Sequence, residues 1–247
     1  MPHILVINPN ISESVTSLIE QEARKAAHAD TRISMATAAF GVEYIETRSE
    51  AAIGAHAVLD IVANAGDAFD AIVIAAFGDP GVKAAKEIAL CPVVGISESA
   101  FATAGLIGGK FSIIAISKRI TAWYQECAMA NGAMYRLASI HSLSTPLKNI
   151  ATVQEDNAER LMELCNASIQ EDGADCIILA GAPLAGLGRQ LRDDIPVPLV
   201  DGVSSGIVIA EALARLSVAP ATAGSFTRPS GKVNQELSPA LARLFTP

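Results

Sequence analysis

The segment Asp70-Ala-Ile-Val-Ile-Ala-Ala76 decides the fold, because it returns later in the chain as Asp175-Cys-Ile-Ile-Leu-Ala-Gly181. Gly81 and Gly186 follow the two segments at the same offset. A short run of branched apolar residues without alternation is typical of a strand buried on both faces of a parallel sheet. Buried strands look alike in any α/β chain, but because the strands and the glycines are separated by the same offset, a duplicated strand–turn–helix–strand unit is favoured.

Outward from these segments, strand-like and helical patterns alternate along the chain, which predicts a parallel α/β fold. The expected strands cover residues 4–7, 31–36, 71–76, 93–96, 111–116, 138–141, 176–180 and 198–200. The expected helices cover residues 12–27, 47–64, 82–89, 121–131, 152–170 and 205–216, with a short one near the C-terminus. The duplication predicts two lobes whose matching strand ends line a shared ligand cleft. We expect the first lobe to comprise residues 1–97 plus about 205–247, and the second about 98–204.

The composition disfavours several classes of protein. Apolar residues make up 51% of the chain and aromatic residues 4%, so the core is expected to be aliphatic. The net charge of −8 disfavours a nucleic-acid or anionic-membrane surface, and no apolar run approaches the ~20 residues of a membrane span. The start at Met1 carries no basic signal-peptide region. We therefore expect a cytoplasmic protein that binds a small molecule and contacts neither nucleic acid nor membrane.

Neither the cysteines nor the histidines are spaced as metal ligands are, so no metal is expected. They are Cys91, Cys127, Cys165 and Cys176, and His3, His28, His56 and His141. The stretch Gly202-Val-Ser204-Ser205-Gly206 matches a nucleophile elbow, but a hydrolase of that kind needs a later histidine, and the last one is His141. Ser204 and Ser205 are better interpreted as helix N-terminal residues that hold an anionic or carbonyl oxygen.

Three charged residues are placed where chemistry is expected in such a fold. Asp79 and Ser97-Glu98 follow predicted strands, so they are candidates for a base, an acid or a hydrogen-bond acceptor, with helix capping as the alternative. Arg48, near a predicted helix start, is able to receive a carboxylate bidentately, with a solvated surface position as the alternative.

Several motifs together resemble the hydantoin/allantoin racemase branch of the aspartate/glutamate racemase superfamily. They are Ile7-Asn8-Pro9-Asn10, Phe77-Gly-Asp-Pro-Gly81, Pro92-Val-Val-Gly-Ile-Ser-Glu98, Phe111-Ser-Ile-Ile114 and Asp201-Gly-Val203. The resemblance covers roughly residues 4 to 217. It implies two Rossmann-like lobes with parallel sheets related by pseudo-twofold symmetry, no cofactor, no metal and a homo-oligomer.

The resemblance also implies a thiol at each of two matching strand ends, where one thiolate removes a proton and the other thiol returns one from the opposite face. Those positions hold Ala76 and Gly181 in this chain, and none of its cysteines aligns with either. We therefore expect a cofactor-independent enzyme of this superfamily that does not use two-thiol racemisation. It would act on a small ureide, cyclic imide or amino-acid-like carboxylate as an isomerase, ring hydrolase or lyase such as a decarboxylase.

Two other functions stay open at this point, a racemase with non-thiol bases and a catalytically silent binding protein. The expected catalytic residues are Asp79, Ser97 and Glu98. Backbone N–H groups at Ala182 and around Gly78 are expected to hold an oxyanion. The expected substrate-binding residues are Asn8, Asn10, Arg48, Phe77, Gly78, Ala182, Pro183 and Ser204.

Overall fold

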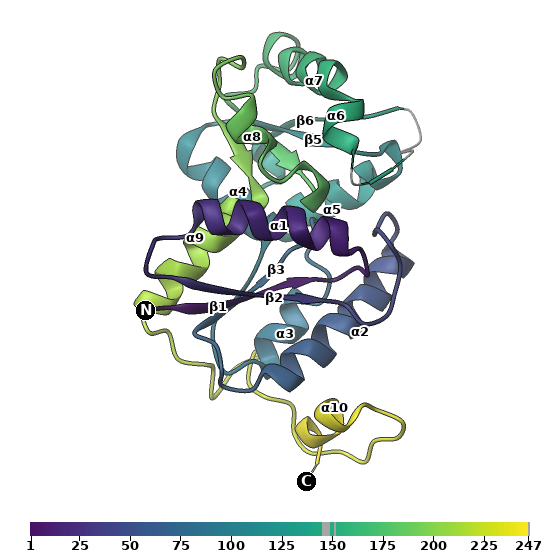
Figure 1. The fold of residues 1–247 in the computed structure, drawn as a ribbon, viewed down its shortest axis with the longest axis vertical. Helices are drawn as coiled ribbons and strands as arrows, with labels where there is room; N and C mark the ends of the chain where they lie inside the picture. Colours follow the sequence, from purple (N-terminus) through teal and green to yellow (C-terminus); the bar gives the residue numbers. More distant parts are fainter. Residues whose placement is uncertain (145–148, 151, 247) are drawn as a thin grey trace.

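The computed structural model describes residues 1–144, 149–150 and 152–246, which form two four-stranded parallel sheets (Figure 1). The first sheet has the order β2-β1-β3-β4 and the second the order β6-β5-β7-β8. The first contains β1 (His3–Asn8), β2 (Arg32–Thr37), β3 (Ala71–Ile74) and β4 (Val93–Gly95). The second contains β5 (Phe111–Ala115), β6 (Leu137–Ser142), β7 (Cys176–Ala180) and β8 (Leu199–Asp201). The identical strand order confirms the two similar lobes; we call them lobe 1 and lobe 2.

Ten α-helices are found in the described ranges. They are α1 (Glu13–Ala26), α2 (Arg48–Ala65), α3 (Val82–Ile88), α4 (Ile96–Ile107), α5 (Thr121–Ala130), α6 (Val153–Asp156), α7 (Ala158–Gln170), α8 (Leu187–Gln190), α9 (Gly202–Arg215) and α10 (Pro239–Leu244). Three short 3-10 turns complete the fold, η1 (Lys118–Ile120), η2 (Met134–Arg136) and η3 (Ala182–Leu184). In this part of the chain, no helix is both long and apolar enough to cross a bilayer.

Two helices join the lobes. Helix α4 follows the lobe 1 strand β4 but packs on β7 and β8 of lobe 2, and α9 follows β8 but packs on β3 and β4 of lobe 1. The two helices also pack against each other, midway between the sheets (Figure 1). The lobe boundaries near residues 97 and 205 stay a prediction.

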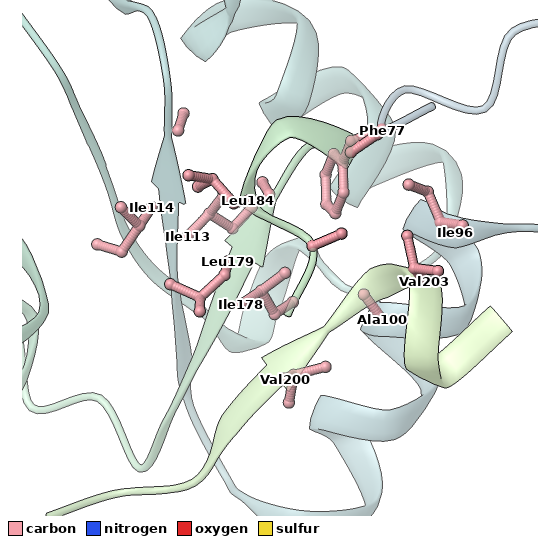
Figure 2. Packing of buried hydrophobic residues seen from close by; sticks show 14 of the residues in the cluster. Phe77, Ile96, Ala100, Ile113, Ile114, Ile178, Leu179, Leu184, Val200 and Val203 are labelled. Carbon is pink, nitrogen blue, oxygen red and sulfur yellow. The ribbon is translucent and has the colours of Figure 1, made fainter. Parts of the chain in front are cut away.

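The main core is aliphatic and continuous between the lobes. Figure 2 shows Ile96 and Ala100 of α4 and Val203 of α9 beside Ile178 and Leu179 of β7. A second, separate cluster fills the other face of the lobe 1 sheet, under α2 and α3. Burying branched side chains on both faces stabilises the sheets by roughly 1.5–3 kcal/mol per side chain, and it fixes where the strand ends meet.

Two helices differ from the sequence expectation. Helix α4 was not expected, because Gly105, Gly108 and Gly109 make its C-terminal part look like a loop. The single helix expected over residues 152–170 is divided into α6 and α7 at Asn157. There the Asn157 side chain donates to the Val153 carbonyl at 2.9 Å, in competition with the helical backbone bonds.

Candidate functional site

A small cavity lies where β3 and β7 run into their turns. Its volume is about 30 Å³, room for a water molecule or two. Its lining comes from both lobes: Asn10, Tyr44, Ile45, Ala75, Ala76, Phe77, Ile116, Tyr124, Gly181, Ala182 and Pro183. The paired strand ends identified in the sequence therefore line one cavity, which includes Ala76 and Gly181, and its role as the functional site stays a prediction.

Each strand end presents two free backbone donors to this site. Beyond β3, the Ala75 N–H still donates to the Ile7 carbonyl at 2.8 Å, but the N–H groups of Ala76 and Phe77 have no acceptor among the described residues. The equivalent N–H groups of Gly181 and Ala182 in lobe 2 also lack an acceptor there. Backbone donors fixed in this way are suited to a negatively charged oxygen.

Two side chains add neutral donors. Asn10 uses its carbonyl oxygen to accept from Asn8 Nδ2 and from the Ser12 N–H, both at 2.9 Å, which leaves its own Nδ2 as the free donor. The Tyr124 hydroxyl would lie 3.8 Å from a Cβ placed on Gly181. Burial is the main reason that the pKa of Tyr124 is raised, so the phenol is neutral at physiological pH and donates a hydrogen bond.

A cross-lobe latch, formed by Glu46 and Arg48 of lobe 1 with Ser117 and Glu126 of lobe 2, holds the segment that carries Tyr44 and Ile45. Ser117 Oγ donates to the Glu46 carboxylate. Arg48 donates to Glu126 from Nε at 2.9 Å and from Nη2 at 2.5 Å. Arg48 is predicted to bind a substrate carboxylate, but the carboxylate that it binds in the structure is that of Glu126, and Arg48 lies outside the cavity lining.

Asp79 caps a helix from beneath the site. It is partly buried, and its two oxygens accept from the N–H groups of Ser97 and Glu98, both at 2.8 Å. A Cβ at Gly95 would come within 2.3 Å of the Asp79 carboxyl carbon, so the glycine makes room for it. Burial raises the pKa of Asp79 to about 7, with a smaller contribution from the negative charge of Glu98.

Ser97 and Glu98 are also engaged in structural contacts. Ser97 Oγ accepts from the Gly78 N–H at 2.5 Å, so this N–H is not available for an oxyanion, contrary to the expectation. Glu98 accepts from Lys86 Nζ at 2.7 and 2.8 Å and from the Gly95 N–H at 3.0 Å. Because Asp79, Ser97 and Glu98 all lie outside the cavity lining, their geometry matches the capping alternative, and a catalytic role for them stays a prediction.

The other expected binding residues divide into two groups. Four of them line the cavity, namely Asn10, Phe77, Ala182 and Pro183. Asn8 is buried one layer below, where its amide donates to Asn10, Ser12 and Thr16, and Gly78 is also outside the lining. Ser204 lies in a separate groove. Sequence reasoning missed Tyr44, Ile45, Ala75, Ile116 and Tyr124, which are apolar or aromatic residues without a motif of their own.

Among the described residues, no cysteine lines the cavity. Cys127 contacts one of the neighbouring loops, with Sγ 3.9 Å from the Gly78 carbonyl. Burial raises the pKa of Cys127 and Cys165 to about 12, and that of Cys91 and Cys176 to about 11. All four thiols are therefore protonated at neutral pH and unsuited to proton abstraction.

Comparisons with known proteins agree with this geometry. The family described as Asp/Glu/Hydantoin racemase matches residues 4–210. This chain belongs to that family. It is 35% identical to a hydantoin racemase from Paenarthrobacter aurescens over 234 residues, which cover 93% of this chain and 98% of the relative.

Solved structures extend the likeness to the fold. An allantoin racemase from Klebsiella pneumoniae superposes with a TM-score of 0.91 at 32% identity, and 99% of each chain is covered. Unliganded arylmalonate decarboxylase superposes with a TM-score of 0.61 at 15% identity, covering 87% of this chain and 93% of the other, which shows the shared fold alone. The protein is therefore a racemase-like enzyme of the Asp/Glu/hydantoin racemase family.

Proposed function

We propose that this enzyme acts on a small ureide, cyclic imide or amino-acid-like carboxylate by forming an enolate or oxyanion, without a pair of thiols. The observation that carries the proposal is the set of donors around the cavity. All of these groups are uncharged hydrogen-bond donors. They are the free N–H groups of Ala76, Phe77, Gly181 and Ala182, together with Asn10 Nδ2 and the Tyr124 hydroxyl. Such a site stabilises negative charge that develops on a substrate oxygen.

The described residues that line the cavity include no carboxylate, imidazole or thiol, which favours one kind of reaction. Proton abstraction from carbon and ring hydrolysis by water both need a general base. Loss of carbon dioxide from a substrate carboxylate needs none, since the electrons of the breaking carbon–carbon bond form the enolate. Tyr124 then donates its hydroxyl proton to the carbanion carbon and regains one from water. Among the reaction types considered, we favour this lyase reaction.

Gly181 supports the absence of thiol chemistry independently. Its φ of +108° lies in the region that favours glycine, so a cysteine at this position would strain the backbone. The turn is built for a residue without a side chain, and the free Gly181 N–H takes part in the site instead.

The test is to follow substrates by NMR in deuterated water. Hydantoins, allantoin, ureidocarboxylates and substituted malonates would be compared. For the substrates that carry a carboxylate, the ureidocarboxylates and substituted malonates, the proposal predicts a decarboxylated product with one deuteron in place of the lost carboxylate, and it predicts no decarboxylation of hydantoins or allantoin. Tyr124→Phe should reduce turnover by roughly 10²–10⁴-fold, whereas Tyr135→Phe, at an exposed tyrosine 76% accessible, should not. Binding of these compounds without any turnover would contradict the proposal and favour a silent binding protein.

A second candidate, a racemase with non-thiol bases, rests on Tyr44 and Tyr124. They reach the cavity from different lobes, which suits two groups acting on opposite faces of a carbon. This candidate predicts deuterium exchange with inversion and no new product. Tyr44→Phe and Tyr124→Phe would then each suppress exchange from a different enantiomer. Equal effects on both enantiomers would contradict it.

A further inference from the structure

A second cavity, of about 220 Å³, is lined by residues of α1, α4, α8 and α9 and of the segment around β8. Its polar lining residues are Glu22, Thr103, Arg189, Arg192, Asp201, Ser204 and Ser205. We call it the α1–α9 groove. It shares no residue with the cavity at the strand ends. The groove therefore needs an explanation separate from the proposed reaction.

Glu22 is the unusual residue in the groove. It projects from α1 of lobe 1, and only 1% of it is exposed. Its Oε1 accepts from Arg189 Nε at 2.8 Å and from the Ser204 hydroxyl. Its Oε2 is buried and has no hydrogen-bond partner among the described residues. A buried carboxylate oxygen without a donor costs about 1–3 kcal/mol or more, so a missing donor is expected there.

The charges around Glu22 indicate that the missing donor is positively charged. Asp201 is a second carboxylate in the groove; it is partly buried, and it accepts from the N–H groups of Ser204 at 3.0 Å and Gly186 at 2.7 Å. Arg189 is the one arginine that pairs with either carboxylate in the described structure. Two carboxylates, of which Glu22 is fully buried, therefore share one paired guanidinium, which indicates that the donor missing beside Glu22 is a cation.

Arg192 adds the opposite sign at the outer part of the groove. It is exposed, and no hydrogen bond or ion pair occupies its guanidinium within the described ranges. An exposed guanidinium on a groove wall is suited to a carboxylate, which it binds bidentately. The groove thus presents acidic groups on one side and a free basic group on the other.

The matching position in lobe 1 shows that the fold itself does not need Glu22. The third residue of α4 is Glu98, which pairs with Lys86 inside its own lobe and has partners for both oxygens. The equivalent residue of α9 is Ser204, and the carboxylate beside it comes from the other lobe. The start of α4 therefore forms without a carboxylate oxygen that lacks a hydrogen-bond donor. The unpartnered oxygen of Glu22 beside α9 is thus not a requirement of the fold.

We propose that the α1–α9 groove binds a small amino acid as its zwitterion. The ammonium donates to Glu22 Oε2, the carboxylate oxygen that has no donor in the described structure, and the ligand's carboxylate is bound by Arg192. The cavity volume limits the ligand to a small side chain. The Gly186 N–H bound by Asp201 follows η3, whose Ala182 and Pro183 line the first cavity. An occupied groove would therefore stabilise the loop that forms one wall of the reaction site.

Isothermal titration with glycine and L-alanine tests the proposal on the full chain. One equivalent should bind saturably, and methylamine or acetate, which each carry one of the two charges, should bind at least tenfold more weakly. Glu22→Gln and Arg192→Ala should each weaken binding at least tenfold. Glu20→Gln, at an exposed position of α1, and Arg160→Ala, on the exposed face of α7, should leave it unchanged.

Two controls keep the result decisive. Arg192 is exposed, so its variant should fold normally even if Glu22→Gln is destabilised, and circular dichroism checks both. Tyr124→Phe should retain the binding, because Tyr124 belongs to the other cavity. The proposal is wrong if neither amino acid binds, if both groove variants bind normally, or if Tyr124→Phe abolishes the binding.

Discussion

In each lobe an aspartate accepts hydrogen bonds from the backbone at the start of a helix, but the aspartate stands at a different position in the two lobes. In lobe 1, Asp79 on the loop after β3 binds the start of α4, and the strand end beside it is Gly95. In lobe 2 the loop position is Leu184, and the strand end is Asp201, which binds the start of α9 and the loop at Gly186. Both lobes keep a partly buried acid between helix and loop, so the duplication preserved the interaction and not the position of the acid.

The largest expected effect comes from crowding the lobe 1 arrangement. Gly95→Ala places a Cβ 2.3 Å from the Asp79 carboxyl carbon, and we expect it to destabilise the fold by about 3 kcal/mol in urea unfolding. Gly188→Ala, where a Cβ meets only ordinary contacts from 3.5 Å outward, is the matched control.

The double variant Asp79→Leu/Gly95→Asp sharpens the comparison further. It copies the lobe 2 arrangement into lobe 1, with the acid on the strand end. If the two arrangements are equivalent, the double variant should be more stable than Gly95→Ala. A double variant that is less stable than Gly95→Ala would show that the lobes are not interchangeable here.

A smaller effect is expected from the titration of Asp79. Its pKa is raised from 3.8 to about 7, so the folded state holds the proton more tightly than the unfolded state. Stability therefore falls as pH rises from about 4 through about 7, and it levels off above. In Asp79→Asn the difference in unfolding free energy between pH 5 and pH 8 should shrink by roughly 2 kcal/mol. An unchanged pH profile would contradict the assignment.

The smallest effect is expected at the cross-lobe latch. Arg48 and Glu126 are both more than half exposed, so their ion pair contributes little to stability and is weakened by salt. Arg48→Ala and Glu126→Ala should each raise KM a few-fold, and the double variant should add nothing more. High salt should mimic them. The exposed Arg160–Glu163 pair on α7 is the control, and its removal should leave KM unchanged.

Sequence alone predicted the fold and the two strand ends that line the first cavity, because strand periodicity and the repeat are local signals. It did not identify Tyr124, since nothing in α5 distinguishes a tyrosine that faces the other lobe from one that fills a core. It also placed Asp79 and Glu98 near the chemistry, because a carboxylate that follows a strand has the same sequence pattern whether it binds a ligand or caps a helix. Their contacts with Gly95 and Lys86 are seen only in the folded structure. Ser204 was assigned to the reaction site, and its actual partner Glu22 is 182 residues away.

The exchange of α4 and α9 has a consequence for how this chain can be divided. Each helix is covalently attached to one sheet and buried against the other. A cut at Gly108–Gly109 would therefore leave a first fragment with an uncovered α4 and a second with an uncovered α9. Expressed alone, each half would expose its apolar helix and aggregate. Expressed together, the halves should reassemble, as in split-protein complementation, with each supplying the helix that the other lacks.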